Sequence, residues 1–187
     1  SIDTIIVGLG NPGKKYEGTR HNAGFAALDH VAEKWGVRVT KAKFDALTGT
    51  GTAAGVKVQL MKPQTFMNLS GDAVRKAADF YKVPPERIIV LFDDISLAPG
   101  PLLILKTGSS GGHNGIKSII GNIGQDFPRV KIGVGEKPRP EYDLADWVLS
   151  RLTQAEKKAV EARYDDICGA LELMMKGQFD TAMSRYN

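Results

Sequence analysis

The alternation of strand-like and helix-like segments constrains the fold of this chain more than any other feature of its sequence. Three short apolar runs rich in β-branched residues are typical of buried strands: Thr4–Leu9, Arg87–Phe92 and Val130–Val134. Segments with apolar residues at helical spacing separate these runs. Such alternation indicates an α/β protein with a mostly parallel sheet. We therefore predict a single-domain, three-layer α/β/α sandwich around a twisted, mixed and mostly parallel sheet.

Periodicity and turn residues predict the remaining elements. The further strands are Ala46–Ala53 and Val56–Met61, paired as a hairpin, and Leu102–Lys106. The helices are one that begins at Asn22 and stops at Gly36, one capped by Ser70 that ends before Pro84 and Pro85, the segment GIKSIIGNI, a long helix over Gln154–Lys176, and a short one over Phe179–Tyr186. We assign all of them to one domain covering residues 1–187.

Composition narrows the class of protein. A chain of 187 residues, 42% apolar and 25% charged, is long enough to bury a core without disulfides or a structural metal. No apolar run reaches the length of a bilayer span, and the first residues lack the character of a secretory signal, so we expect a cytoplasmic protein. Cys168 is the only cysteine, which excludes an internal disulfide, and we expect it to be buried in a helix. The net charge of +4 weakly favours a polyanionic partner.

Polar side chains follow several of the predicted strands. In an open α/β sheet, ligands bind beyond the carboxyl ends of the strands. The candidates there are Asn11 and His21 on the first loop, Asn68 after the hairpin, the adjacent Asp93 and Asp94, and His113 with Asn114 in a glycine-rich loop. This set combines a base, carboxylates and three carboxamides.

His21 and Asp93 are the candidate catalytic pair. His21 stands at the start of a helix, where the helix dipole disfavours imidazolium, whereas a nearby carboxylate would favour it and orient the ring. The two effects together can keep a histidine poised near neutral pH as a general base. Each residue also has an ordinary interpretation, because His21 could cap or pack a helix and Asp93 could close a turn. The asparagines could orient water, hold a peptide or stabilise an oxyanion, or could only close turns.

Two glycine motifs raise alternatives. The segment GLGNPG, residues 8–13, matches the dinucleotide fingerprint G-x-G-x-x-G after a strand, which suggests a nicotinamide-dependent oxidoreductase. Pro12 and a further stretch of loop separate these glycines from the helix, and this context argues against that alternative. The segment LKTGSSGGHNG is not a Walker loop; it could hold a phosphate at a helix N-terminus or be a mobile loop.

Other hydrolytic motifs are missing from the sequence. It contains no G-x-S-x-G, H-E-x-x-H or C-x-x-C, so a covalent serine mechanism and a zinc mechanism both lack carriers. Water activated by His21 is the mechanism that remains. His30 lies mid-helix and is interpreted as structural or solvated. The span Glu136–Val148, a proline-rich loop that passes into a short amphipathic segment, is a candidate lid.

Four segments together resemble the motifs of the bacterial-type peptidyl-tRNA hydrolases, and the resemblance covers nearly the whole chain. The segments are VGLGNPGKKYEGTRHNAGF, KPQTFMNLSG, DDISLAPG and GSSGGHNGIKSI, and the terminal GQFDTAMSRYN is also similar to the end of the family. The family's functional positions fall on Asn11, Tyr16, His21, Met67, Asn68, Asp93, His113 and Asn114. A set of this size is far more specific than any single glycine motif.

The resemblance implies an esterase that hydrolyses the bond between a peptide and the 3′ ribose of tRNA, without a metal or cofactor. His21 would be the base and Asp93 its orienter, while Asn11 and Asn68 would hold the peptide and terminal nucleotide, and Asn114 would position water or the oxyanion. Tentative contacts to tRNA phosphates are Lys106, Lys117 and Lys131, with Lys14, Lys15 and Arg20 nearby in sequence. We expect a monomer with no obligate protein partner and no membrane association.

Three positions depart from the family pattern. Phe92 replaces a frequent His before the catalytic aspartate, Ser96 replaces a second Asp, and Lys131 replaces a frequent Arg. Relatives of this fold in plant organelles serve in RNA splicing without hydrolysis, so a binding protein is the alternative function. The presence of His21, Asp93 and the three asparagines argues against that alternative.

Overall fold

One seven-stranded sheet organises the protein. The computed structural model describes residues 1–187, and its strands follow the order β2-β3-β4-β1-β5-β7-β6. The strands are β1 (Thr4–Gly8), β2 (Lys41–Lys43), β3 (Ala46–Ala53), β4 (Val56–Pro63), β5 (Ile88–Asp94), β6 (Leu102–Leu105) and β7 (Arg129–Gly133). The four central strands β4, β1, β5 and β7 are mutually parallel, and β3 and β6 run against them. The mixed, mostly parallel sheet is therefore confirmed.

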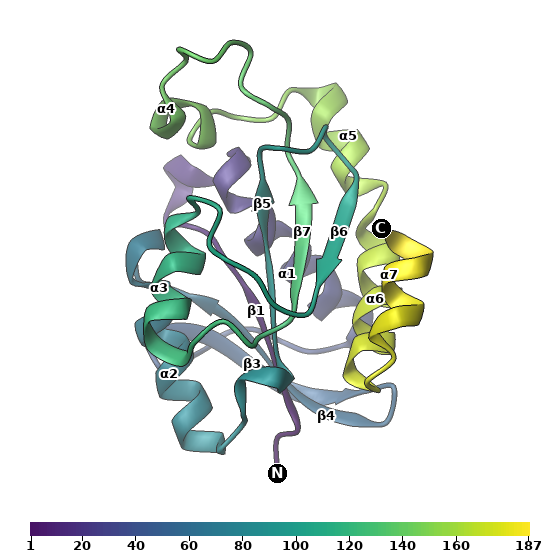
Figure 1. The fold of residues 1–187 in the computed structure, drawn as a ribbon. Helices are drawn as coiled ribbons and strands as arrows, with labels where there is room; N and C mark the ends of the chain where they lie inside the picture. Colours follow the sequence, from purple (N-terminus) through teal and green to yellow (C-terminus); the bar gives the residue numbers. More distant parts are fainter.

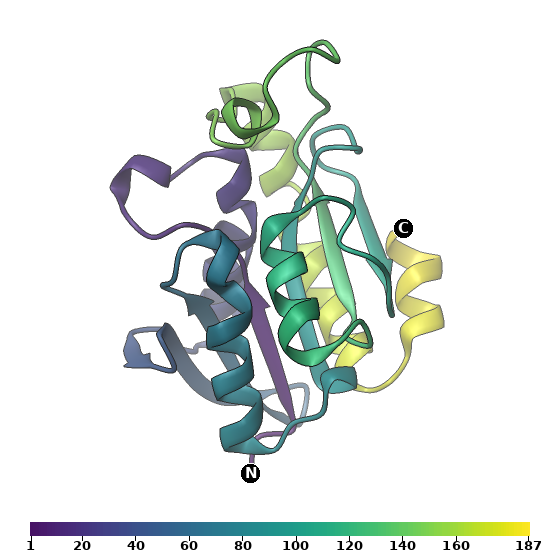
Figure 2. The same ribbon diagram turned by 60° about the vertical axis from the view of Figure 1, so that its left-hand side comes forward.

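Helices cover both faces of the sheet, as the predicted three-layer sandwich requires. They are α1 (Ala23–Trp35), α2 (Ser70–Tyr81), α3 (Asn114–Ile123), α4 (Leu144–Val148), α5 (Gln154–Glu161), α6 (Tyr164–Met175) and α7 (Phe179–Tyr186). The core on one face includes residues of α1, α6 and α7, and the core on the other includes residues of α2 and α3, which lie side by side in Figure 2. The central strands are buried on both faces, which explains why β1 and β5 are continuous apolar runs rather than alternating ones.

The glycines of the dinucleotide-like motif serve helix packing. A Cβ on Gly8 would come within 2.5 Å of the Gly24 carbonyl oxygen, and one on Gly10 would come within 2.6 Å of the Phe25 ring. A Cβ on Gly24 would in turn meet the Leu91 carbonyl oxygen at 2.4 Å. These glycines let α1 approach the sheet closely. The chain also makes two 3₁₀ turns, Lys14–Tyr16 (η1) and Arg20–Asn22 (η2), before α1 begins, so the motif does not open into a helix.

Two sequence-based predictions about helices are wrong in detail. The long helix expected over Gln154–Lys176 is interrupted at Ala162 and Arg163, which separate α5 from α6. Val160 and Ile167, on either side of the break, both join the core on the α1 face. The amphipathic pattern continues through the break, and neither Gly nor Pro marks it. The sequence therefore gives no local signal that the helix is interrupted. Ser70 does begin α2, but its hydroxyl donates to the Met67 carbonyl and does not cap the helix.

The direction of β6 also differs from the simplest interpretation of the sequence. This edge strand is antiparallel to β7, so its carboxyl end lies at the opposite end of the sheet from the carboxyl ends of β5 and β7. The loop after β6 returns along the sheet to the start of α3, as Figure 1 shows. His113 and Asn114 thus reach the functional end of the sheet on a returning loop and not directly from a strand end.

Two smaller expectations concern burial and membranes. Cys168 is buried in α6, as predicted, and its burial raises the pKa of the thiol to about 11. No helix has both the length and the apolar character that crossing a bilayer would require.

Candidate active site

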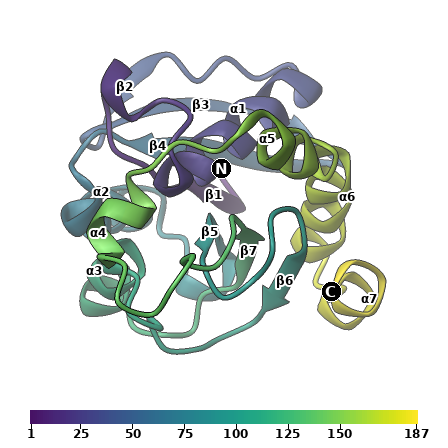
Figure 3. The ribbon, with the colours of Figure 1, turned by 90° about the horizontal axis from the view of Figure 1, so that it is seen from above.

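A cavity of about 860 Å³ lies where the predicted site residues meet. Seen from above in Figure 3, α4 and the loop before it lie over this end of the sheet. The lining residues are Asn11, His21, Phe66, Met67, Asn68, Phe92, Asp93, Asp94, Ile95, Ser96, Ser110, Gly111, Gly112, His113, Asn114, Lys131, Leu144, Ala145, Val148 and Leu149. Elements spread over the chain between residues 11 and 149 contribute, and they bring together five of the six predicted substrate-binding residues with the two catalytic candidates.

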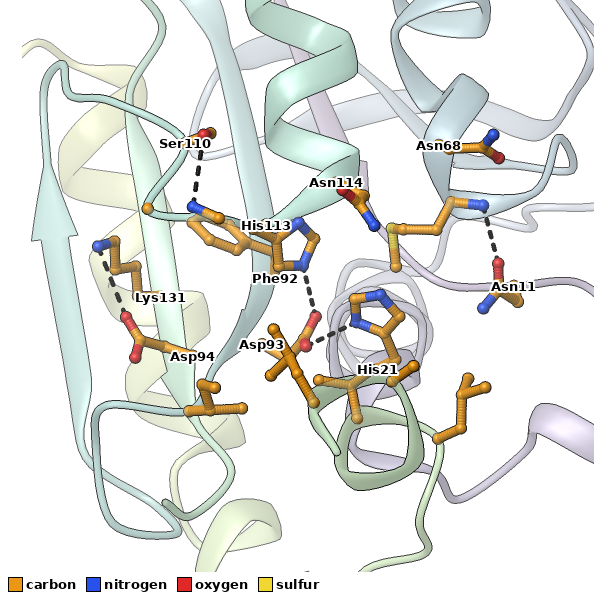
Figure 4. A pocket seen from close by; sticks show the side chains of 18 of the residues that line it. Asn11, His21, Asn68, Phe92, Asp93, Asp94, Ser110, His113, Asn114 and Lys131 are labelled. Atoms are coloured by element: carbon orange, nitrogen blue, oxygen red, sulfur yellow. Dashed lines mark hydrogen bonds and ion pairs between the residues drawn. The ribbon is translucent and has the colours of Figure 1, made fainter. Parts of the chain in front are cut away.

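Asp93 sits between two histidines in this cavity. Its Oδ2 atom lies 2.7 Å from Nδ1 of His21, and its Oδ1 atom lies 2.8 Å from Nε2 of His113 (Figure 4). The carboxylate is almost fully buried at the end of β5, while both rings retain about a tenth of their side-chain surface. The sequence paired His21 with Asp93 correctly, but it gave His113 a substrate-binding role and did not anticipate its bond to Asp93.

The hydrogen bonds determine which ring nitrogens carry protons. The backbone N–H of Ile116 donates to Nδ1 of His113 at 3.2 Å, so Nε2 of His113 carries the proton that Asp93 accepts. Asp93 also accepts the Nδ1 proton of His21. Neutral His21 is therefore unprotonated at Nε2. No protein group pairs with that atom, which leaves it able to accept a proton in the cavity.

Electrostatics poise this cluster for base catalysis. Burial tends to lower the pKa of His21, but the charge of Asp93 and the hydrogen bond to it raise that pKa, and the net result lies above the ordinary histidine value. Burial tends to raise the pKa of Asp93, yet the charges of His113 and His21 outweigh burial and hold that pKa well below the usual range. Asp93 is thus ionised at neutral pH, and it can orient the imidazole and stabilise the imidazolium.

Asn11 is clamped from two sides. Its backbone N–H donates to Oδ1 of Asn22 at 2.8 Å, and Asn22 returns a hydrogen bond from Nδ2 to the Asn11 carbonyl at 2.9 Å. The Asn11 side-chain oxygen accepts the backbone N–H of Met67 at 2.8 Å. Because its oxygen is occupied, the Nδ2 group of Asn11 is the part that remains free to donate to a ligand.

Asn68 and Asn114 leave both of their carboxamides free. Asn68 lies in the 3₁₀ turn Met67–Leu69 (η3), and Asn114 is the first residue of α3. Both are exposed and line the cavity from its α2 and α3 side, and neither side chain makes a hydrogen bond within the protein (Figure 4). Free amides at fixed positions can bind a carbonyl, a ribose hydroxyl or a water molecule.

The candidate lid forms an apolar wall of the cavity. We call Leu144, Ala145, Val148 and Leu149 the α4 wall, since all four line the cavity from α4 and its C-terminal end. The side chain of Asp143 caps α4 by accepting the backbone N–H groups of Ala145 and Asp146. An apolar wall opposite a row of polar groups suits a ligand that is partly peptide or nucleobase and partly phosphoester.

The same three acid–base residues could also hold a metal ion. Their potential ligand atoms in His21, Asp93 and His113 all lie within 4.8 Å of one another. The two nitrogen–oxygen distances are those of hydrogen bonds, in which each ring donates a proton to a different carboxylate oxygen. A metal ion would have to displace both protons.

Comparison with known proteins identifies the family. The family model described as peptidyl-tRNA hydrolase matches residues 5–187. The chain belongs to the peptidyl-tRNA hydrolase family. Family membership assigns the activity, hydrolysis of peptidyl-tRNA, which makes the protein a carboxylic ester hydrolase.

Individual peptidyl-tRNA hydrolases agree with this assignment over the full length of the chain. The protein of that name from Agathobacter rectalis is 54% identical over 185 residues, which cover 98% of this chain and 99% of the relative. The one from Caldanaerobacter subterraneus is 50% identical and covers 98% of both chains. The crystal structure of peptidyl-tRNA hydrolase from Acinetobacter baumannii superposes with a TM-score of 0.93 at 35% identity, covering 99% of this chain and 94% of that one.

The structure distributes the remaining predicted residues unevenly around the peptidyl-tRNA hydrolase site. Tyr16 lies outside the cavity lining and packs edge-on against Phe66, with 6.4 Å between ring centroids. Lys131 lines the cavity and pairs with Asp94 at 3.5 Å. Lys117 is exposed one turn after the start of α3. Lys106 follows β6 at the far end of the sheet, with its ammonium over the Phe179 ring.

Arg20 corrects one expectation. It was grouped with the basic residues near the tRNA candidates, but its side chain is only 4% exposed and is paired with Glu156. A guanidinium in that position cannot reach a phosphate outside the protein. Lys14 and Lys15, by contrast, are exposed on η1.

Two departures from the family pattern find local roles. Phe92 is buried and packs edge-on against the His113 ring, with 4.9 Å between centroids, so it supports the second histidine with an apolar surface. The backbone N–H and the hydroxyl of Ser96 both donate to Oδ1 of Asp94. Asp94 therefore holds the loop after β5, whereas the adjacent Asp93 accepts hydrogen bonds from the two histidines.

Sequence reasoning missed several residues of the site. Phe66 and Leu149 line the cavity, and Asn22 clamps Asn11. Phe66 lies directly before Met67 in a family motif, which is a usable signal. Asn22 directly follows His21 in another family motif, which is a signal of the same kind. The rest of the α4 wall falls within the span Glu136–Val148, which the sequence already suggested as a lid.

Proposed function

We propose that a water molecule in the cavity, deprotonated by Nε2 of His21, attacks the ester carbonyl that joins the peptide to tRNA. The observation that carries this proposal is the 2.7 Å bond from Nδ1 of His21 to the buried, ionised Asp93, which leaves Nε2 free in the cavity. An ester is activated enough for one oriented water and a general base to cleave it.

The proton and the electrons follow one path in this mechanism. His21 takes a proton from water, the resulting hydroxide adds to the carbonyl carbon, and the carbonyl oxygen becomes an oxyanion. The intermediate collapses by breaking the bond to the 3′ ribose oxygen, which receives the proton from His21. Asp93 stabilises the imidazolium throughout, and His113 shares the same carboxylate and holds it in place.

The three asparagines have distinct proposed roles. We propose that Asn114 Nδ2 donates to the oxyanion or the attacking water; its free carboxamide at the His113 side of the cavity supports this role. Asn68 and the free Nδ2 of Asn11 hold the peptide and the terminal nucleotide. Met67 and the α4 wall supply apolar contact to the same ligand.

The direct test is release of peptide from an N-blocked aminoacyl-tRNA by the purified protein. Product is followed as free tRNA on acid gels, and His21→Ala serves as the inactive control. Equal release by the wild type and the control would refute the mechanism, and absence of release by the wild type would refute the activity in this chain.

Turnover is expected to survive chelation. The proposed mechanism uses only side chains and water, so kcat and KM in EDTA should match those in untreated buffer within about a factor of two. The measurement is peptide release after dialysis against EDTA, with Zn²⁺ or Mg²⁺ added back in parallel. Loss of turnover in EDTA with recovery on metal addition would instead support a metal ion among His21, Asp93 and His113.

Binding of tRNA is expected to weaken steeply with salt. The protein carries a net charge of +4, and Lys117 and Lys131, with Lys106 as a more distant candidate, are proposed to contact phosphates. Affinity measured by fluorescence anisotropy at about 50 to 200 mM salt should fall linearly on a log–log plot, with the slope reduced by about one for each phosphate-contacting lysine changed to alanine. A lysine variant with the wild-type slope would remove that residue from the tRNA contact.

Other aspects of the proposal concern assembly and location. We propose that the monomer is the active form. Peptidyl-tRNA arises in translation, and the cytoplasm is accordingly the proposed location. Sedimentation at assay concentration would test the first point, since activity confined to a larger species would contradict it.

A further inference from the structure

The side chain of Arg20 occupies a buried position between α4 and α5. Its guanidinium lies 3.7 Å from the centroid of the Trp147 ring on α4. It also donates to both carboxylate oxygens of Glu156 on α5, at 3.1 to 3.2 Å, and to the Val134 carbonyl oxygen at 3.4 Å. Arg20 directly precedes His21 in η2.

The backbone of the same residue contacts the other end of the wall segment. The Arg20 N–H donates to the Ser150 carbonyl oxygen at 2.9 Å, and the Leu152 N–H donates to the Gly18 carbonyl oxygen at 3.1 Å. Thr19 and Arg151 form an antiparallel bridge between these bonds. The turn that carries His21 is thus joined to the chain that leaves α4 as in a short β-ladder.

Arg20 therefore contacts both ends of the segment that carries the α4 wall, residues 134–150. The entering end is held through Val134 and through Trp147, whose ring N–H donates to the Gly135 carbonyl oxygen at 3.0 Å. The leaving end is held through Ser150. Since α4 has no buried residue of its own, its position relative to the site depends on such ties.

The chemistry of these contacts requires arginine specifically. A planar guanidinium can stack on an aromatic ring and at the same time donate along its edge to a carboxylate, whereas a lysine ammonium cannot do both. Glu156 is itself fixed, because its carboxylate accepts the Thr153 N–H in the capping box of α5. The contact to Glu156 therefore ties Arg20 to a helix that packs on the core.

We propose that Arg20 is a positioning residue for the hydrolysis of peptidyl-tRNA, one that holds the α4 wall and the His21 turn in a fixed relation. This inference rests on the proposed function, because it assigns the wall to substrate binding and His21 to catalysis. Loosening of the wall acts on substrate binding and hence on KM. Loosening of η2 acts on the base and hence on kcat.

Two variants separate these effects. Trp147→Leu removes the stacking partner and the ring N–H that donates to Gly135 but leaves η2 intact, so KM should rise about tenfold while kcat stays within about twofold. Arg20→Met keeps a long apolar side chain without the guanidinium, so KM should rise by a similar factor and kcat should fall about tenfold. Both are measured by peptide release at 25 °C on protein whose folding is verified by circular dichroism and thermal melting.

A double-mutant cycle provides a readout that a purely structural role would not move. In kcat/KM, the two substitutions should be strongly non-additive, because the second has no stacking contact left to remove. Arg163→Met is the matched control: Arg163 precedes α6, pairs with Asp166 at 2.8 Å and does not line the cavity, so its replacement should leave kcat and KM unchanged.

The outcomes are decisive in either direction. Wild-type kinetics for folded Arg20→Met, or additive effects in the cycle, would overturn the positioning role. Should Arg20→Met fail to fold, Trp147→Leu decides alone, since an unchanged KM contradicts the proposal. Failure of the proposed function itself is distinguishable, because it would appear as absence of peptide release by the wild type.

Discussion

Replacement of His21 by alanine is expected to lower kcat by a factor of about 10²–10⁴, the usual contribution of a positioned general base. Nε2 of His21 is the only unpaired base atom of the His21–Asp93–His113 cluster, because Nδ1 of His113 accepts the Ile116 N–H. KM should change little, since the asparagines and the α4 wall remain. Single-turnover peptide release with excess enzyme measures the chemical step directly and separates it from product release.

His30→Ala is the matched control for this experiment. His30 is also in the α1 region and also pairs with a carboxylate, Asp165, at 3.2 Å, but it is partly exposed and lies outside the cavity. Its replacement should leave kcat and KM at wild-type values. A His21→Ala variant that is folded and as active as His30→Ala would exclude His21 as the base.

Replacement of Asp93 by asparagine is expected to lower kcat by a similar factor, about 10²–10⁴. The substitution preserves shape but removes the charge that stabilises the imidazolium. The Asn amide nitrogen is a donor, so it would face the ring N–H of His21 or His113, which the carboxylate oxygen accepts in the wild type. No buried charge is left unpaired in the variant, but the two facing N–H groups cost about 1–3 kcal/mol of stability. Thermal melting should confirm a folded protein before kinetics are compared.

The pH dependence supplies a second readout for Asp93. In the wild type, kcat/KM should rise as pH increases through the pKa of His21, which lies above the ordinary histidine value. The charge of Asp93 and its hydrogen bond are what raise that pKa, whereas burial lowers it. Asp93→Asn removes the raising causes and leaves burial, so the residual activity should reach its plateau at a lower pH than in the wild type.

Asp165→Asn controls for loss of an ordinary carboxylate–histidine contact. Asp165 pairs with His30 and Lys34 on the surface, and its replacement should shift neither kcat nor the pH profile. An Asp93→Asn variant with a wild-type pH profile would show that Asp93 does not control the protonation of His21.

Much of the central sheet could be predicted because its signal is local. The runs that form β1 and most of β5 are continuously apolar, and parallel strands covered by helices on both sides produce that pattern. The α1 stop at Gly36 was equally clear, since that glycine adopts the left-handed conformation that ends the helix. The presence of these strands and the end of α1 can therefore be predicted from residues that are neighbours in the sequence.

Elements whose course depends on distant packing were harder to predict. The break between α5 and α6 leaves the amphipathic pattern intact, because Val160 before it and Ile167 after it join the same core, so no local signal indicates it. The direction of β6 was also hidden, because a short apolar run has the same sequence in either orientation. His113 was placed near the site by sequence for a partly wrong reason.

The sequence by itself determined which chemical groups are available and on which loops they stand. His21, Asp93 and the asparagines follow buried segments, and a chain-long set of motifs ties them to one family. These are properties of residues and their immediate neighbours, and they survive without knowledge of the fold.

Only the tertiary structure decided how those groups act together. Asp93 serves His21, 72 residues away, and His113 on its opposite side, so the two rings share one carboxylate. Arg20, which the sequence suggested as a phosphate contact, meets Glu156, 136 residues away, and lies inside the protein. Such pairings depend on strand order, strand direction and the return path of loops, and the free energy that selects them is spread over the whole core rather than encoded near any one residue.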